Sequence, residues 1–286
     1  MVGVRERNLM SPRRNSITVF VVLVVLLALA ARRLGVAGSA AAQMNSASSV
    51  SNAPDAASTP VLVELFTSEG CSSCPPADGL LSRLGKTQPV RGAEIIALEE
   101  HVDYWDRLGW KDPFSSEAAT ARQNEYDMAF AGGEAYTPQM IVDGRAQFVG
   151  RSDSDALRAI RTASQAPKPA VQLSWENDDV LKIHIEPLTN TAERDGQQVF
   201  LAVAENMLHS DVKRGENAGR ALEHNGVVRQ LLPLGKIDSA PVGFSSSVAV
   251  RSVREWNRAN LRAVVFVQER RSRHVLAAAT TPFPAE

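Results

Sequence analysis

The chain contains two cysteines, and both lie in the tetrapeptide Cys71-Ser72-Ser73-Cys74. A chain of 286 residues with this cysteine pattern is not a multi-disulfide scaffold, so cross-links do not replace a hydrophobic core. Hydrophobic residues make up 44% of the sequence, an ordinary share for a globular protein that buries such a core. All thiol chemistry is therefore confined to one short segment.

This segment lies between a predicted strand and a predicted helix. Val61–Phe66 is a short apolar run that ends before Gly70, and Ala77–Leu84 has leucines at helical spacing. The first turn of a helix offers free N–H groups and the positive end of the helix dipole, which stabilise a thiolate. A thiolate is the form of cysteine that attacks a disulfide. We therefore expect Cys71 to be exposed at the helix cap and Cys74 to lie one turn deeper, where it releases the product.

A C-x-x-C pair alone does not decide the chemistry, because zinc sites and structural disulfides use the same spacing. Its position after a strand and before a helix favours a redox pair. A zinc site normally has four ligands, and here only His101 or another single histidine could join the two sulfurs. Three interpretations stay open: a redox pair, an inert structural disulfide, and a binding site for Cu(I) or Zn(II).

The remainder of residues 60–166 alternates strands with helices. Ser115 or Ser116 can cap a helix, and Asp143-Gly144 between two apolar runs is a strong hairpin signal. These patterns predict, in chain order, a strand over Ala93–Leu98, a helix over Glu117–Ala129, a hairpin of Gln139–Val142 and Ala146–Val149, and a helix over Ser152–Ile160. On the longer helix, we expect a solvated face that carries Arg122, Gln123 and Tyr126.

Residues 167–286 have a different pattern. Seven short, strand-like segments follow the stretch Ala166–Pro169 at regular spacing, which is typical of an antiparallel β-sandwich. They are Val171–Trp175, Val180–Glu186, Val199–Asn206, Val227–Leu234, Val242–Val250, Leu261–Gln268 and His274–Thr281. The charged, glycine-punctuated segment Asp211–Arg229 is either a solvated loop or a contact surface that faces the cysteines.

Three blocks of sequence resemble an uncharacterised family of secreted bacterial proteins, domain-of-unknown-function family 1223. They are Val61–Asp78, His101–Phe114 and Tyr136–Gly144, and the resemblance extends over nearly all of residues 60–286. The family is classed with the thioredoxin-like superfamily, whose order of strands and helices matches the predicted one. The expected fold class is therefore an α/β thioredoxin-like domain over residues 60–166, followed by an antiparallel all-β sandwich-like domain over residues 167–286. The resemblance brings no established substrate.

The predicted catalytic residues are Cys71, Cys74, Pro138 and Glu64. The resemblance implies that Pro138, at the start of a strand, is a cis proline beside the cysteines. It also implies a buried acid that handles the proton of Cys74, and Glu64 lies near the required point of the strand. The alternative for Glu64 is a carboxylate at the rim of a sheet edge.

Three more side chains are expected to line a substrate groove: Thr137, Trp105 and His101. An aromatic surface suits an unfolded polypeptide, although Trp105 can instead be half-buried packing for its loop. His101, with Asp103 or Asp106, is a candidate base or metal ligand. The simpler interpretation is that His101 hydrogen-bonds a neighbouring loop.

The N-terminus has the pattern of an export signal. Four arginines precede Ile17–Ala31, an apolar run of 15 residues, and small residues follow at Ala40–Ala42. A membrane span needs about 20 apolar residues, so cleavage after Ala42 is the first interpretation. Arg32 and Arg33 leave an uncleaved inner-membrane anchor open. Residues 1–42 are thus predicted to be a signal peptide or anchor and residues 43–59 a flexible linker, which places the folded part in the periplasm or outside the cell.

The 31 basic and 32 acidic residues give a net charge of −1, which argues against nucleic acid as a partner. The sequence predicts an exported thiol:disulfide oxidoreductase that uses Cys71 and Cys74 on protein substrates, without a cofactor or a metal. Its partners would be exported protein thiols or disulfides, or a protein that recycles the pair, and only an uncleaved N-terminal segment would meet a membrane. The alternatives are a periplasmic thioredoxin-like protein that binds Cu(I) or Zn(II), and an interaction module with a structural disulfide.

Overall fold

The computed structural model describes residues 58–130, 133–188, 196–237, 243–251 and 253–285, which belong to one compact unit. The predicted signal peptide or anchor (1–42) and nearly all of the predicted linker (43–59) lie outside the described residues. Within the described ranges, no helix is long and apolar enough to cross a membrane.

The first half of the described chain has the predicted strands and helices in the predicted order. Strand β1 leads to the cysteines, helix α1 follows them, and β2 pairs with β1 in parallel. The elements are β1 (Thr59–Thr67), α1 (Pro75–Thr87), β2 (Ala93–His101), the 3-10 helix η1 (Asp106–Leu108), α2 (Glu117–Ala129), β3 (Gln139–Val142), β4 (Ala146–Val149) and α3 (Asp153–Ser164).

Local sequence signals explain where several of these elements begin and turn. The Ser116 side chain accepts a hydrogen bond from the Ala119 N–H, so Ser116 caps α2 as predicted. The β3–β4 hairpin turns at Asp143 and Gly144, which have φ of 48° and 63°. Any other residue at Gly144 would place its Cβ 1.8 Å from a backbone oxygen, so this turn requires glycine.

All seven strands predicted in the second half are present, and two more accompany them. The predicted loop Asp211–Arg229 contains one of the additional strands and the start of β10, and the other additional strand ends at its first residue. The strands are β5 (Val171–Asn177), β6 (Val180–Ile185), β7 (Gln197–Glu205), β8 (Leu208–Asp211), β9 (Ala221–His224), β10 (Val227–Ile237), β11 (Phe244–Ala249), β12 (Leu261–Glu269) and β13 (Val275–Pro282), with a 3-10 helix η2 (Arg258–Asn260) before β12.

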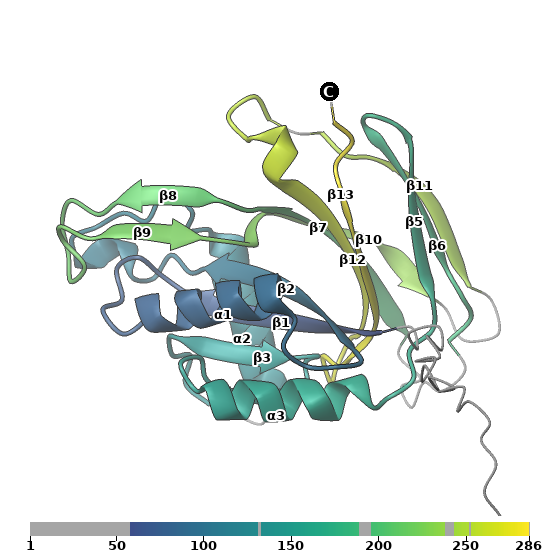
Figure 1. The fold of residues 1–286 in the computed structure, drawn as a ribbon, viewed down its shortest axis with the longest axis horizontal. Helices are drawn as coiled ribbons and strands as arrows, with labels where there is room; N and C mark the ends of the chain where they lie inside the picture. The colour runs from purple at the N-terminus through teal and green to yellow at the C-terminus, as the bar shows by residue number, and fades with distance from the viewer. Residues whose placement is uncertain (1–57, 131–132, 189–195, 238–242, 252, 286) are drawn as a thin grey trace, which may run out of the picture. The chain divides into compact units, whose positions relative to one another are not determined.

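The predicted fold class, a thioredoxin-like α/β domain followed by a separate antiparallel sandwich, is wrong. Strands from both halves form one mixed eight-stranded sheet with the order β13-β12-β7-β10-β2-β1-β3-β4. The two halves meet where Val227 of β10 pairs in parallel with Glu99 of β2. Two smaller sheets accompany it in the described part of the chain: β5, β6 and β11 form one, and β8 pairs with β9 in the other (Figure 1).

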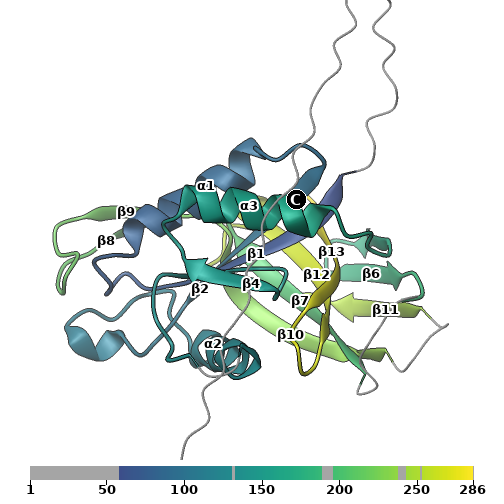
Figure 2. The same cartoon turned by 90° about the horizontal axis from the view of Figure 1, so that it is seen from below.

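The helices cover both faces of the first half of the sheet. Helices α1 and α3 lie on one face and α2 on the other (Figure 2). Val61, Val63 and Leu65 of β1 pack with α1 and α3 in one core cluster. The alternate residues Leu62 and Ile96 point the other way and pack with residues of β7, β12 and β13. The second half of the chain thus buries apolar surface that the first half would otherwise expose.

Candidate functional site

Cys71 and Cys74 form a disulfide at the junction of β1 and α1, with their Cα atoms 5.5 Å apart. The expected exposure of Cys71 at the helix cap is wrong. Cys74 is the N-cap residue of α1, and the exposed fractions of Cys71 and Cys74 are 1% and 0%. Ser73 is exposed, and its hydroxyl lies 3.3 Å from Cys71 Sγ. After reduction, this hydroxyl can donate a hydrogen bond to a Cys71 thiolate.

The segment between β8 and β9, residues 212–220, contacts the cysteine segment, and we call it the cover loop. Asn217 is buried, and its Nδ2 donates hydrogen bonds to the backbone oxygens of Glu69 and Cys71, over 2.8 and 2.9 Å. Glu216 accepts a hydrogen bond from the backbone N–H after Cys71, over 3.0 Å. Asp211–Arg229 is therefore more than a solvated loop, because part of it contacts the cysteine segment.

The peptide bond between Thr137 and Pro138 is cis, as the resemblance implied. The antiparallel register of β1 and β3 places Pro138 beside the end of β1 that leads to the cysteines. Trp105 connects the two segments, because its Nε1 donates to Thr137 Oγ1 over 2.9 Å and its Cβ would lie 3.1 Å from a Cβ at Gly70. Trp105 and Thr137 are partly buried and lie next to the cysteine segment.

Glu64 is buried, but on the face of the sheet that carries α2. Val63 and Leu65 face α1, so Glu64 points to the opposite side. Arg122 Nε donates to Glu64 Oε1 over 2.6 Å, and the Tyr126 hydroxyl donates to Oε2. Its carboxylate is therefore engaged by α2 and points away from the helix that Cys74 caps. The alternative, a carboxylate at a sheet rim, is also wrong because β1 is an interior strand.

The predicted solvated face of α2 is buried. Arg122, Gln123 and Tyr126 are exposed by 3%, 0% and 1%. Strand β12 explains the error, because it extends the sheet and contributes Gln268, which accepts a hydrogen bond from Arg122 Nη1 over 3.3 Å. A helix face that the first half alone would leave in water is covered by the second half.

His101 is buried and does not line a surface groove. Its orienting acid is Asp112, whose Oδ2 lies 2.7 Å from His101 Nδ1. Asp112 Oδ2 also accepts a hydrogen bond from the Glu69 N–H over 2.8 Å. The two acids named from sequence hold the surrounding loop: Asp103 accepts from the Thr120 hydroxyl, and Asp106 accepts from the Asp112 N–H.

His101 and four other buried side chains lie together and form a group that we call the imidazole cluster. Its members are Glu69, Glu99, His101, Asp112 and His224. His224 Nδ1 lies 2.7 Å from Glu99 Oε1, and His224 Nε2 lies 3.3 Å from Glu69 Oε1. The two imidazole rings are edge to face, with centroids 4.8 Å apart. Glu69 is two residues before Cys71, so the cluster adjoins the disulfide segment.

The imidazole cluster shifts the acidity of its members. Burial opposes the charged imidazoles, but Asp112 raises the pKa of His101 well above its ordinary value, and Glu99 raises that of His224 to about 9. Burial also opposes the charged carboxylate of Glu99, yet His224 lowers its pKa to about 2. Burial, with Glu99 nearby, raises the pKa of Asp78 on α1 to about 7.

Several residues of the site were missed at the sequence level, among them Asp78, Glu99, Asp112, Asn217 and His224. Nothing local marks Asp112, which stands eleven positions after His101 in a loop. Asn225-Gly226 after Ala221–His224 signals a turn, but β9 and β10 on either side of it do not pair with each other, so this signal does not place His224. Its partners Glu69 and Glu99 lie 155 and 125 residues away, respectively, and no spacing rule predicts such a pairing.

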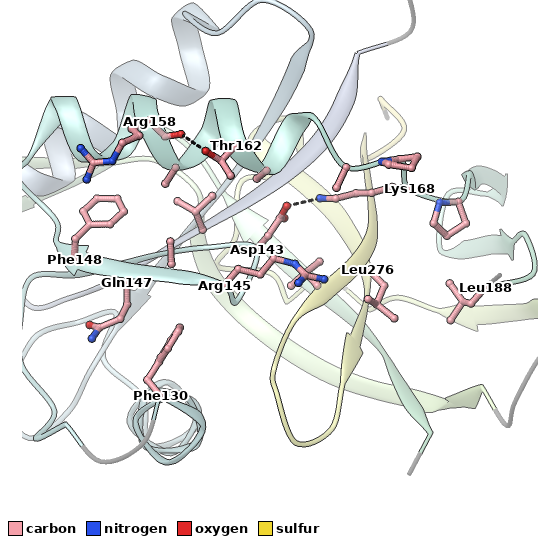
Figure 3. A pocket seen from close by; sticks show the side chains of 18 of the residues that line it. Phe130, Asp143, Arg145, Gln147, Phe148, Arg158, Thr162, Lys168, Leu188 and Leu276 are labelled. Carbon is pink, nitrogen blue, oxygen red and sulfur yellow. Dashed lines mark hydrogen bonds and ion pairs between the residues drawn. The ribbon is translucent and has the colours of Figure 1, made fainter. Parts of the chain in front are cut away.

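A pocket of about 1190 Å³ lies elsewhere, between α3, the β3–β4 hairpin and β13 (Figure 3). Its lining includes Phe148 and Leu276, and the ion pair between Lys168 Nζ and Asp143 Oδ2, 2.6 Å apart, closes one side. None of the residues that line it belongs to the cysteine segment. The pocket therefore does not border the disulfide.

Comparison with known families identifies the chain. The family model for proteins of unknown function designated DUF1223 matches residues 62–268. The chain belongs to the DUF1223 family. No curated protein compared with this DUF1223 protein matches it.

Two solved structures resemble this DUF1223 protein over most of its length. Protein AGR_C_4864 from Agrobacterium tumefaciens is 25% identical with a TM-score of 0.65, and the match covers 80% of this chain and 96% of that chain. HBP35 of Porphyromonas gingivalis is 12% identical with a TM-score of 0.57, and the match covers 80% of this chain and 76% of that chain. The second likeness concerns the fold alone.

Proposed function

We propose that this DUF1223 protein is an exported thiol:disulfide oxidoreductase whose Cys71–Cys74 pair exchanges with thiols or disulfides of other exported proteins. The observation that carries the proposal is the disulfide itself, set between β1 and α1, with the cis proline Pro138 beside the end of β1 that leads to it. Export and a relationship to the thioredoxin-like superfamily are parts of this proposal. The apolar segment before residue 58 supports export.

The exchange needs no atoms beyond the two proteins. A substrate thiolate attacks Cys71 Sγ, the Cys71–Cys74 bond breaks, and Cys74 leaves as a thiolate that takes up a proton. The second substrate thiolate then attacks the mixed disulfide and releases Cys71, which leaves the substrate oxidised and the pair reduced. A recycling partner with its own disulfide must reoxidise the pair. With a substrate disulfide, the same steps run in reverse.

Both sulfurs are buried, so exchange with a protein substrate requires a conformational opening, which the proposal assigns to the cover loop. Asn217 and Glu216 hold this loop to the cysteine segment through three hydrogen bonds. Each such bond contributes about 0.5–1.5 kcal/mol net, which thermal opening can overcome. The proposal therefore includes an open conformation in which the cover loop leaves Cys71.

A test of the proposal is trapping of the mixed disulfide. Reduced Cys74→Ser protein is mixed with a disulfide-containing test protein, and we expect a covalent complex through Cys71 that a reductant dissolves. Cys71→Ser is the matched control and should form no such complex, because its remaining cysteine is the resolving one. No turnover by the wild-type protein, or equal trapping by both variants, would refute the assignment.

The burial of both sulfurs favours a second candidate function, in which the disulfide is structural. In that case the bond fixes the start of α1 and the imidazole cluster beside it, and other surfaces of the chain carry the function. The candidates differ in how the disulfide responds to reductants. A structural disulfide resists the glutathione pool, whereas a redox pair equilibrates with it.

A further inference from the structure

The imidazole cluster contains a set of metal-binding donors that the redox proposal does not use. Glu99, His101 and His224 each offer one ligand atom, and these three atoms lie within 4.8 Å of one another. Glu99 and His101 are two residues apart on β2, so their side chains point to the same face of the sheet. His224 joins them from the end of β9. The exposed fractions of the three are 1%, 2% and 1%.

A second observation points to a ligand at this place. Three buried atoms of the imidazole cluster have no hydrogen-bond partner within the described part of the chain: His101 Nε2, His224 Nε2 and Glu69 Oε1. Buried polar atoms are nearly always hydrogen-bonded, so His101 Nε2, which lies beside Glu99 without a hydrogen bond, indicates a bound group. His101 Nε2 lies 3.4 Å from Glu99 Oε1. Ligand atoms about 2.0–2.1 Å from a tetrahedral ion are separated by roughly 3.3 Å.

Asp112 orients His101 in the manner typical of metal-binding histidines. Such a histidine uses one ring nitrogen for the metal and the other for a carboxylate or carbonyl. Asp112 Oδ2 accepts a hydrogen bond from His101 Nδ1 over 2.7 Å, which leaves His101 Nε2 available to bind a metal ion. Asp112 is itself fixed by backbone N–H groups of Glu69 and Phe114, over 2.8 and 2.9 Å. The ring of His101 is therefore held in place before any ion binds.

We infer that Glu99, His101 and His224 bind one divalent transition-metal ion, with Zn²⁺ the best match to this donor set. Two imidazoles and a carboxylate are a common zinc ligand set, with His224 binding through Nδ1, the nitrogen 2.7 Å from Glu99 Oε1. Glu69 Oε1 lies beside Nε2 on the other side of that ring and orients it. The carboxylates of Glu69, Glu99 and Asp112 surround the rings, and their negative charge favours a cation. The site contains no sulfur, so it differs from a metal site at the cysteines and does not depend on the redox proposal.

Metal binding by the full-length chain tests this inference. Protein purified without a metal-binding tag is stripped with EDTA and titrated with Zn²⁺ or with Co²⁺, whose visible spectrum reports coordination. We expect about one equivalent to bind. X-ray absorption at the zinc edge should show nitrogen and oxygen at about 2.0–2.1 Å and no sulfur at about 2.3 Å.

Variants locate the ion. His101→Gln and His224→Gln should each weaken binding at least tenfold. His209→Gln is the matched control, because His209 lies on β8 of the same hairpin and is exposed, and it should bind as the wild type does. Cys71→Ser/Cys74→Ser should also retain the ion. This double variant separates the inference from the redox proposal, since it abolishes disulfide exchange and leaves the metal ligands intact.

Three results would overturn the inference. The first is a stripped wild-type protein that binds less than a tenth of an equivalent, which would leave two protonated imidazoles paired with carboxylates as the explanation of the cluster. The second is a sulfur shell around zinc, with binding lost in the double cysteine variant. The third is equal loss of binding in His209→Gln and His224→Gln. If a variant does not fold, the Co²⁺ and X-ray absorption spectra of the wild-type protein still show whether an ion binds through nitrogen and oxygen ligands.

Discussion

Glu100 points away from the imidazole cluster, toward Arg122 of α2. Arg122 Nε lies 3.8 Å from Glu100 Oε1, and Glu64 of β1 shares the same guanidinium. Burial raises the pKa of Glu100 to about 7, although Arg122 and His101 act to lower it and Glu64 adds to the rise. The folded protein therefore binds this proton more tightly than the unfolded chain, in which the ordinary pKa is 4.5.

We expect this proton to make stability depend on pH. The contribution of this bound proton to the free energy of unfolding is complete below pH 4.5 and is lost as the pH rises through about 7. A shift of this size corresponds to roughly 3 kcal/mol of unfolding free energy. Glu100→Gln should remove that part of the decline, as measured by urea unfolding of EDTA-treated protein between pH 4.5 and 7.5. Glu94→Gln, an exposed glutamate on the same strand, is the control, and parallel profiles for Glu100→Gln and wild type would show that Glu100 does not titrate in this range.

Single residues also show why part of the site was not predictable. Cys71, Cys74 and Pro138 were found because each has a local signal in the sequence or in the family resemblance. His101 was a candidate, but its partner Asp112 was not, because a hydrogen bond across a loop leaves no periodic trace. Arg122 was placed on a solvated face because polar residues on a helix usually are. Its burial depends on β12, more than 130 residues later in the chain.

Among the elements, the β8–β9 hairpin has the closest relation to the proposed chemistry. Its cover loop is hydrogen-bonded to the cysteine segment, so under the proposal the rate of reduction should depend on how often this loop opens. Asn217→Ala removes two hydrogen bonds to the cysteine segment, worth about 1–3 kcal/mol together. We expect the disulfide of this variant to be reduced by dithiothreitol about tenfold faster than that of the wild type.

Lys213→Ala is the control for this measurement, because Lys213 lies in the same cover loop, is exposed and forms an ion pair with Asp211, away from the cysteine segment. Its reduction rate should match the wild type. If Asn217→Ala is reduced at the wild-type rate, the cover loop does not limit access to Cys71, and the disulfide must be reached by another route.

Elements with strong local signals were predicted with their bounds. Glu117–Ala129, Gln139–Val142 and Ala146–Val149 agree with the structure because a serine cap and an Asp-Gly turn define them. Strands β8 and β9 were missed since each is only four residues long and their segment is rich in charge and glycine. The pairing of strands was the larger error, because the alternation of a strand shows its faces but not its neighbours.

For the whole molecule, the shared sheet has a direct consequence for stability. Leu62, Ile96 and Leu98 of the first half pack with residues of β7, β12 and β13. A fragment of residues 58–166 would expose this surface and leave β2 without its neighbour β10. We expect the fragment to lack cooperative unfolding by circular dichroism, while residues 58–286 unfold in one transition. A fragment that unfolds cooperatively would show that the first half is an independent domain.

The proposed function depends on whether the buried disulfide is exchangeable at cellular potentials. The most direct test is the reduction potential of Cys71–Cys74 in glutathione or dithiothreitol buffers, with the two redox states separated by thiol alkylation. The account predicts a value between about −270 and −120 mV, the range of disulfide oxidoreductases. A value below about −300 mV is typical of structural disulfides and would contradict the redox function.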